Sequence, residues 1–391
     1  MPHRNRSRSA LGTILVMWLA VACGSATATL TPTPTLWPRP AATPTTTPTL
    51  GPTATPTAAP TPTPTVGPGG FPRRFRVKGN AFVDQFGTKM IFRGIDALDP
   101  VLQKVDPRMP VWSDNYYKAI ASWGANIIRV PIVPLSIHQY GMDAVLSVLD
   151  QTVAWAAKNK MYVIIDFHSV GWIPENWYPN GGDDETTAAE WTGFWKTISS
   201  HYAGNDVVAF YELFNEPALN YKTHPYPYPA AEWSIWKGYL DTLIKKTIRP
   251  NDPGKTLLVG GVLSAYDLEY VAHAPIADSS RNVAYSTHPY DWISKLNVGW
   301  DTAFGKLSSK YPVFATEYGY DSPDPGTRIG GVVYHQALID YLEAHHISWT
   351  AWSFGDNWPP SLLKDRSTFE PTESGAYFKN RLLKLNGHPS P

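Results

Sequence analysis

The chain has 391 residues, 43% of them hydrophobic and 13% aromatic, which is enough for a sizeable core in one large domain or two ordinary ones. Four of its 33 basic residues lie in residues 1–70, which contain no Asp or Glu, so residues 71–391 hold 29 basic against 33 acidic side chains. This slightly acidic balance argues against a nucleic-acid partner, because phosphate binding requires a basic surface, and we expect an uncharged substrate.

Residues 1–23 predict a signal peptide for export. Three arginines precede the apolar stretch ALGTILVMWLAVAC, which is too short to span a bilayer comfortably. Cys23 ends this stretch in LAVACGS, which resembles a bacterial lipoprotein cleavage box, although Ala20 stands where that box usually has Leu. Two readings follow: a lipid on Cys23 that attaches the protein to the membrane, or an ordinary cleavage site with a coincidental cysteine. Because Cys23 is the single cysteine, we expect no disulfide.

Residues 24–70 predict a disordered linker. Within residues 31–68, 12 of 38 residues are Pro and 14 are Thr, with almost nothing that could be buried. Such a segment cannot offset the entropy lost on ordering, so we expect a semi-rigid tether. The remaining residues, 71–391, form the predicted catalytic domain.

The predicted domain alternates strand and helix patterns. FRVKGNAFVDQFGTKMIF, residues 75–92, predicts a β-hairpin, with glycines at its turns. Eight short apolar runs then predict strands at residues 91–96, 126–132, 161–167, 207–213, 256–261, 283–290, 312–318 and 347–354. Helical periodicity separates them. Eight apolar strands, each followed by a helix, indicate an α/β fold, the (β/α)8 TIM barrel, as a single domain with the hairpin at its bottom.

Polar and aromatic residues follow most of the predicted strands. Active sites in such barrels lie at the carboxyl ends of the strands. One such residue alone more often supports the scaffold than catalyses, but together they indicate a site. They are Arg129, Asp166, His168, Asn215, Glu216, His288, Tyr290, Glu317 and Trp352.

These motifs resemble glycoside hydrolase family 5 (cellulase family A), whose members are retaining glycosidases on (β/α)8 barrels. The resemblance rests on RVP, FNEP, HPY and ATEYG after the second, fourth, sixth and seventh strands, and on the Trp of the eighth, and it covers nearly all of residues 75–386. It implies that Glu216 is the general acid/base and Glu317 the nucleophile. It also implies that Arg129 and Tyr290 donate hydrogen bonds to Glu317, and that Asn215 donates to the 2-hydroxyl of the sugar. His168 and His288 are supporting residues in this reading.

Glycosidic bond cleavage explains the need for two carboxyl groups. One must protonate a poor leaving group while the other, ionised, stabilises or attacks the developing oxocarbenium ion. A separation of about 5 to 5.5 Å gives net retention of configuration. One departure from the family concerns the first strand, where many cellulose-cleaving members carry a histidine and this chain has Asp96. Asp96 could contact a sugar hydroxyl or cap the loop, and the subfamily stays open.

Aromatic residues in the long loops are candidate platforms for sugar rings, whose CH faces pair with aromatic faces, although we expect some of them to pack within the loops. Trp352 is the strongest candidate, with a barrel-core tryptophan as the alternative. The loop candidates are Trp172, Trp177, Tyr221, Tyr226, Tyr228, Trp292 and Trp358.

Three functions remain open from the sequence. The first is an exported, endo-acting β-1,4-glucanase acting on cellulose or mixed-linkage β-glucan, and the second is the same machinery on mannan, xyloglucan or another β-glycan. The third is a catalytically silent carbohydrate-binding barrel, against which the presence of both glutamates argues. The histidines show no metal-binding spacing and there is no CxxC motif, so we expect no metal and no cofactor. We expect a monomer outside the cell, secreted or lipid-anchored, with a polysaccharide substrate.

Overall fold

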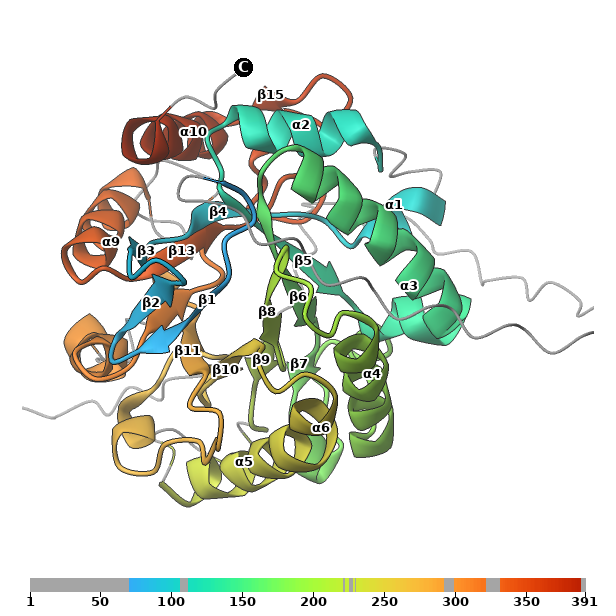
Figure 1. Cartoon of the computed structure of the whole chain (residues 1–391), viewed down its shortest axis with the longest axis vertical. Coiled ribbons are helices and arrows are strands. Elements are labelled where there is room, and N and C mark those ends of the chain that lie inside the picture. Colours follow the sequence, from blue (N-terminus) through green and yellow to red (C-terminus); the bar gives the residue numbers. More distant parts are fainter. Residues whose placement is uncertain are drawn as a thin grey trace, which may run out of the picture. The chain divides into compact units, whose positions relative to one another are not determined.

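The computed structural model describes residues 70–105, 112–220, 222–224, 228, 230–291, 299–320 and 331–387. They contain a closed barrel of eight parallel strands surrounded by helices (Figure 1). The barrel strands are β4 (Arg93–Asp96), β5 (Ile127–Ile132), β6 (Tyr162–Phe167), β8 (Val208–Glu212), β10 (Thr256–Gly260), β11 (Val283–Thr287), β12 (Val313–Ala315) and β13 (Ser348–Ala351). Each lies within one of the eight predicted runs, and β13 pairs with β4 to close the barrel. The predicted (β/α)8 fold is confirmed.

Helices follow seven of the eight barrel strands. They are α1 (Pro100–Val105), α2 (Asp114–Ser122), α3 (Pro134–Lys158), α4 (Ala188–His201), α5 (Ala230–Leu243) with η2 (Ile244–Ile248) and α6 (Arg249–Asn251), η4 (Asp301–Gly305) with α8 (Lys306–Ser308), α9 (Val332–Ala344) and α10 (Glu373–Asn386). In the described parts of the chain, no helix combines the length and the apolar character that crossing a membrane requires.

The connection from β10 to β11 lacks the predicted α-helix. All of its residues are described, and they hold only the short 3-10 helix η3 (Glu269–Ala272). The reason lies in Leu263, Ser264 and Ala265, whose φ angles of 63°, 50° and 60° are left-handed. Three such residues in a row reverse the chain and are incompatible with the start of a right-handed helix. The expectation of a helix after every strand is therefore wrong at this position.

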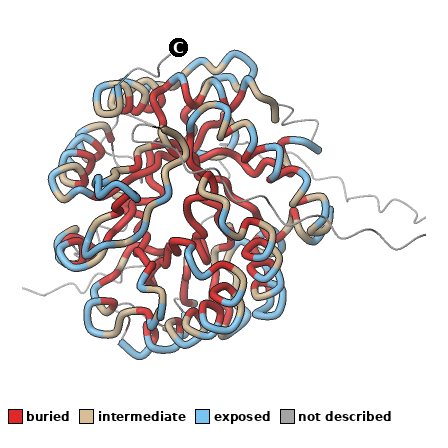
Figure 2. Tube along the Cα trace, viewed as in Figure 1, coloured by how far each residue is buried: buried red, intermediate tan, exposed pale blue. Residues whose placement is uncertain are grey.

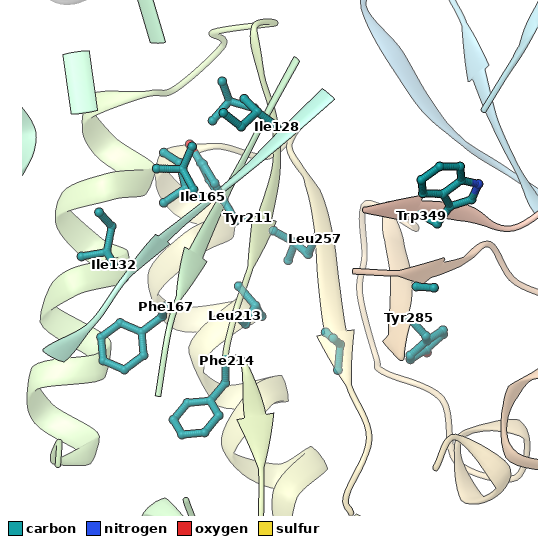
Figure 3. Close-up of a cluster of buried hydrophobic side chains, with 14 of the residues drawn as sticks. Ile128, Ile132, Ile165, Phe167, Tyr211, Leu213, Phe214, Leu257, Tyr285 and Trp349 are labelled. Carbon is teal, nitrogen blue, oxygen red and sulfur yellow. The ribbon is translucent and has the colours of Figure 1, made fainter. Parts of the chain in front are cut away.

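Most of the core lies between the barrel and its helices. Buried residues are concentrated along the strands and the inner sides of the helices (Figure 2). Ile128, Ile165 and Tyr211 from β5, β6 and β8 belong to one large buried cluster (Figure 3), which also contains Val145 and Leu149 of α3. Because side chains alternate along a strand, this packing leaves the other half of the strand residues to fill the barrel.

An aromatic cluster closes the amino-terminal end of the barrel. The predicted hairpin is a three-stranded antiparallel sheet of β1 (Phe75–Lys78), β2 (Ala81–Asp84) and β3 (Lys89–Met90). Its Phe75 ring lies 5.0 Å from that of Phe92 and 5.1 Å from that of Phe210, measured between ring centroids. The hairpin therefore covers the bottom of the barrel, as expected from the sequence.

Two small strand pairs complete the described fold. Near the carboxyl end of the barrel, β7 (Val170–Gly171) pairs in parallel with β9 (Glu216–Pro217). β14 (Leu363–Asp365) and β15 (Glu370–Pro371) form a hairpin before α10. The first pair connects the loop after β6 to the segment after β8, which carries two of the predicted site residues.

Candidate active site

Four charged residues face the interior of the barrel. In β8, Phe210 belongs to the interior aromatic cluster, and Glu212, two residues further along, faces the interior as well. Arg129 and Asp166 have the same relation to Ile127 and Ile164 of that cluster, Asp96 is the last residue of β4, and all four charged residues are fully buried. In register, Asp96 lies beside Arg129 and Asp166 beside Glu212. Side chains that point into the barrel are thus apolar near its amino-terminal end and charged nearer its carboxyl end. We call Asp96, Arg129, Asp166 and Glu212 the charged layer.

Arg129 is the centre of this charged layer. Its Nε donates to Glu212 (2.6 Å), its Nη1 to Glu317 (3.0 Å), and its Nη2 to Asn215 Oδ1 (2.7 Å). Nη2 also lies 3.0 Å from a carboxylate oxygen of Asp166. Burial lowers the pKa of Arg129, but the nearby carboxylates raise it by more, so the net pKa lies well above its usual value. A buried cation requires such compensation, and in return it holds Asn215 and Glu317 in place.

Glu317 follows β12 and keeps only 9% of its side chain exposed. Its Oε1 accepts from the Tyr290 hydroxyl (2.9 Å) and its Oε2 from Arg129 (3.0 Å), which are the two hydrogen bonds expected from the resemblance. Burial raises the pKa of Glu317, but the charges of His288 and Arg129 lower it more, and the net pKa lies below its ordinary value. Glu317 is therefore an ionised carboxylate at the mouth of the barrel.

Glu216 lies beside Glu317 in a different environment. Its backbone is held by the pairing of β9 with β7, in which its N–H donates to Ser169 O (3.1 Å). Its side chain is 14% exposed, and its Oε1 lies 3.0 Å from Nδ1 of His288. The side chain of Glu216 thus contacts a histidine, His288, whereas that of Glu317 accepts from the guanidinium of Arg129 and the phenol of Tyr290.

The protonation of His288 follows from its other neighbour. The Thr316 hydroxyl donates to Glu212 (2.6 Å), so its oxygen is left to accept from His288 Nε2 (3.1 Å). Nε2 therefore carries a proton, and Nδ1 faces Oε1 of Glu216. Burial lowers the pKa of His288, but Glu317, Glu212 and Glu216 raise it to about 10.

The spacing of the two glutamates suits a retaining glycosidase. One oxygen of Glu216, one of Glu317 and a nitrogen of His288 all lie within 4.8 Å of one another. Retaining enzymes separate their carboxyl groups by about 5 to 5.5 Å and inverting enzymes by about 6.5 to 9.5 Å. This trio has the spacing of metal ligands, but both oxygens of Glu317 and both nitrogens of His288 already have hydrogen-bond partners. The trio therefore fits acid–base chemistry better than metal binding.

Parallel aromatic rings lie beside the charged layer. The Trp352 ring is nearly parallel to that of His168 (centroids 5.2 Å apart, 5° between planes) and to that of Trp358 (5.7 Å, 15°). His168 is held by a contact of 2.7 Å between its Nδ1 and Asp166. Trp352 keeps 7% of its surface exposed, and Trp358 is half-buried. This arrangement offers flat, partly accessible faces at the same end of the barrel as both glutamates.

The prediction that Trp172 is a sugar platform is wrong. Its side chain is fully buried in the core and packs against Trp236, with ring centroids 5.6 Å apart. Tyr228 is likewise a core residue. Trp177 is half-buried against the same core and stays a prediction. The other loop candidates and the lipidation candidate lie outside the described residues: Tyr221, Tyr226, Trp292 and Cys23.

Two buried acids belong to the charged layer: Glu212, for which the sequence gives no site prediction, and Asp96, expected to contact a sugar hydroxyl or cap a loop. Glu212 receives hydrogen bonds from Arg129 and Thr316, and the one sign of it in the sequence is an acidic residue inside an apolar strand. Asp96 neither reaches the surface nor caps a loop, so both sequence interpretations of it are wrong. It is fully buried, and neither of its carboxyl oxygens has a hydrogen-bond partner.

A cavity of about 570 Å³ lies at the other end of the barrel, between the amino-terminal hairpin and the starts of β8 and β10. Among its charged residues, Arg74 of the loop before the hairpin donates to Asp206 (3.1 Å), and Lys255 donates to the carbonyl oxygens of Asn205 and Val208. The Arg74 contact attaches the amino-terminal segment to the residues before β8.

Comparisons with known proteins show the family of this chain. Residues 83–358 match the family described as Cellulase (glycosyl hydrolase family 5). Cellulase CelDZ1 from Thermoanaerobacterium sp is 28% identical over 294 residues, which are 70% of this chain and 69% of that protein. An endoglucanase from Halalkalibacter akibai is 25% identical over 347 residues, which are 78% of this chain and 41% of that protein.

Among solved structures, the beta-glucanase SdGluc5_26A from Saccharophagus degradans in complex with cellotetraose is 33% identical to this chain. The two structures superpose with a TM-score of 0.71, and the match covers 80% of this chain and 94% of that one.

Proposed function

The chain belongs to glycosyl hydrolase family 5, and we propose that it cleaves β-1,4-linked glucans inside the chain, with retention of configuration, after export from the cell. Membership makes it a glycoside hydrolase. The observation that carries the proposed mechanism is the pair of neighbouring glutamates with different partners. Glu317 accepts from Arg129 and Tyr290, whereas the oxygen Oε1 of Glu216 lies beside Nδ1 of His288.

The proposed reaction has two steps. In the first, Glu317 attacks the anomeric carbon while Glu216 gives its proton to the leaving glycosidic oxygen, and a covalent glycosyl–enzyme forms. In the second, Glu216 takes a proton from water, the water oxygen bonds to the anomeric carbon, and Glu317 leaves. Each step inverts the anomeric carbon, so the product retains the configuration of the substrate.

Asn215 is proposed to bind the sugar 2-hydroxyl. Its Oδ1 accepts from Arg129, which leaves the amide Nδ2 to donate. A hydrogen bond to the 2-hydroxyl strengthens as the transition state forms, so its worth lies mainly in the reaction rate.

The choice of β-glucan rests on three supports. The relatives are called cellulase, endoglucanase and beta-glucanase, and one of them is solved with cellotetraose. The parallel rings of Trp352 and Trp358 suit the flat faces of successive glucose rings. The substrate is uncharged, in accord with the slightly acidic domain.

Export and anchoring are proposed from residues 1–70 alone. The signal peptide, Cys23 and the Pro/Thr-rich linker form a series that suits a barrel held away from a membrane surface. Mass spectrometry of the mature amino terminus tests this: a lipid on Cys23 supports the anchor, and an unmodified start leaves a freely secreted enzyme.

The experiment that tests the activity is a reducing-sugar assay on a panel of glycans. We expect hydrolysis of carboxymethylcellulose and mixed-linkage β-glucan to exceed hydrolysis of mannan, xylan and xyloglucan. The Glu317→Gln variant is the matched control, because it keeps the shape of the side chain and removes the charge. A viscosity that falls faster than reducing ends appear indicates cleavage inside the chain. Activity on mannan alone would overturn the assignment of β-glucan, and inactivity on every glycan would favour a binding protein.

A further inference from the structure

Asp96 is the one member of the charged layer that no hydrogen bond explains. It ends β4, beside Arg129 in register, and its backbone is fixed by the hydrogen bond from Phe354 N to its carbonyl oxygen (2.8 Å). Its carboxyl group is fully buried, and neither oxygen has a hydrogen-bond partner. Its nearest opposite charge is Nη1 of Arg129, 3.8 Å from Oδ1, which is beyond hydrogen-bond distance.

The remaining hydrogens of Arg129 explain why this distance matters. Nε donates to Glu212, and Nη2 has both Asn215 and Asp166 as partners. Nη1 donates one hydrogen to Glu317 at 3.0 Å. Its other hydrogen has no acceptor within hydrogen-bond distance among the described residues, and Oδ1 of Asp96 at 3.8 Å could accept it after a small movement. Glu317 and Asp96 are therefore the near and the far acceptor of one nitrogen.

An ionised Asp96 would be costly at this place. A buried carboxylate without hydrogen bonds is strongly unfavourable, and a neutral acid is much less so. Burial raises the pKa of Asp96, the Arg129 charge lowers it less, and Glu317 and Glu212 raise it again, so the net pKa lies well above its usual value. The titratable and charged groups that act on Asp96 or are acted on by it are Arg129, Glu212, Glu317, His288, Tyr290 and Tyr318.

We propose that Asp96 is a positioning residue that acts through Arg129. In the free enzyme it is an uncharged carboxylic acid, which leaves Nη1 of Arg129 hydrogen-bonded to Glu317. When Glu317 bonds to the anomeric carbon and the glycosidic oxygen leaves with the proton of Glu216, the Glu317 ester becomes a weak acceptor. Nη1 then donates to the side-chain carbonyl oxygen of Asp96, so that this nitrogen keeps an acceptor in the intermediate. This step rests on the proposed role of Glu317, whereas the uncharged state of Asp96 does not.

The uncharged state is tested by infrared difference spectroscopy of the intact enzyme without substrate. We expect the wild type at neutral pH to show the C=O band of a buried carboxylic acid that Asp96→Asn lacks, because the band of any other protonated acid cancels between the two. The acid limb of kcat/KM, which reports ionisation of the nucleophile, should stay in place in Asp96→Asn. In Asp166→Asn, which removes a carboxylate 3.0 Å from Arg129, that limb should move to lower pH. Absence of the band, or a shift of the limb by about one pH unit or more in Asp96→Asn, would overturn the uncharged state.

The acceptor role is tested by comparing Asp96→Asn with Asp96→Leu, which fills similar space without an oxygen. We expect Asp96→Leu to lower kcat on an aryl glucoside about tenfold with little change in KM, and Asp96→Asn to recover most of that loss, because its amide oxygen can accept from Nη1. Equal loss in both variants would overturn the acceptor role. The infrared result is independent of activity, so failure of the proposed function and failure of this inference are distinguishable.

Discussion

His288 Nδ1 lies 3.0 Å from Glu216 Oε1, and the hydrogen bond from His288 Nε2 to Thr316 leaves Nδ1 to face this carboxyl group. Burial lowers the pKa of His288, but the neighbouring glutamates raise it to about 10, so Nδ1 carries a proton towards Glu216 below that pH. The alkaline limb of kcat/KM should therefore depend on His288.

Replacing His288 should therefore narrow the active pH range. In His288→Asn the nitrogen that holds this proton is lost, and we expect the alkaline limb of kcat/KM to move to lower pH by about one unit or more. The matched control is His224→Asn, which removes a histidine that hydrogen-bonds to Glu175 and Glu232 instead of Glu216. An alkaline limb that stays in place in His288→Asn would mean that the histidine takes no part in holding the proton.

Trp352 and Trp172 form a second matched pair. Trp352 is at the mouth of the barrel with part of its surface exposed, whereas Trp172 is fully buried against Trp236. We expect Trp352→Ala to lower turnover on polysaccharide far more than it lowers Tm. Trp172→Ala should do the reverse, with a loss of about 3 to 5 kcal/mol in the free energy of unfolding. Equal losses of turnover and Tm in Trp352→Ala would make it a core residue.

The convergence of the predicted site residues could be read from the sequence because parallel barrel strands end at the same face. Asn215, Glu216, His288 and Glu317 each follow the end of a barrel strand, so the positions of the strands alone place them at one face. Arg129 lies inside β5 instead, and it reaches them because its side chain is long and points into the barrel.

The remaining features depend on information that short apolar runs do not contain. Glu212 and Asp96 face the interior because of strand register, which only pairing with neighbouring strands determines. The prediction for Trp172 is wrong because whether a loop side chain faces solvent or the core depends on the residues that the loop packs against, here Trp236. No α-helix follows β10 because three successive residues there have left-handed backbone conformations. None of the three is glycine, so their residue types do not indicate such a conformation.

The ion pairs of His224 predict a pH dependence of stability. Its Nε2 lies 2.6 Å from Glu175, in the loop after β6, and its Nδ1 lies 3.0 Å from Glu232 on α5. Burial lowers the pKa of His224, but hydrogen bonds with both glutamates raise it more, so the folded pKa lies above the usual value of about 6.5. A raised folded pKa stabilises the protein fully below pH 6.5 and loses this effect as the pH rises through the folded pKa.

The His224→Gln variant measures this contribution. The His224 side chain is 20% exposed, so we expect its two ion pairs together to stabilise the fold by about 1 kcal/mol or less, or about 2 °C in Tm. The difference in Tm between wild type and variant should be largest near pH 6 and shrink as the pH rises. A difference that is constant with pH would show that the contacts do not depend on the charge of the histidine.

The two glutamates are separated by role in the proposed mechanism, and azide distinguishes the roles. Glu216→Ala should lose most activity on polysaccharide yet keep much of the first step on an aryl glycoside with a good leaving group, because that step then needs little acid assistance. Azide should enter the space left by the carboxylate, attack the glycosyl–enzyme formed on Glu317 and give a β-glycosyl azide. Glu317→Ala should be inactive on both substrates without azide, and any azide product should be the α-anomer, because azide then attacks the substrate itself. Anomers obtained the other way round would exchange the two roles. Inverted product from the unmutated enzyme would overturn the proposed retaining mechanism, which is supported by an oxygen of Glu216 lying within 4.8 Å of an oxygen of Glu317.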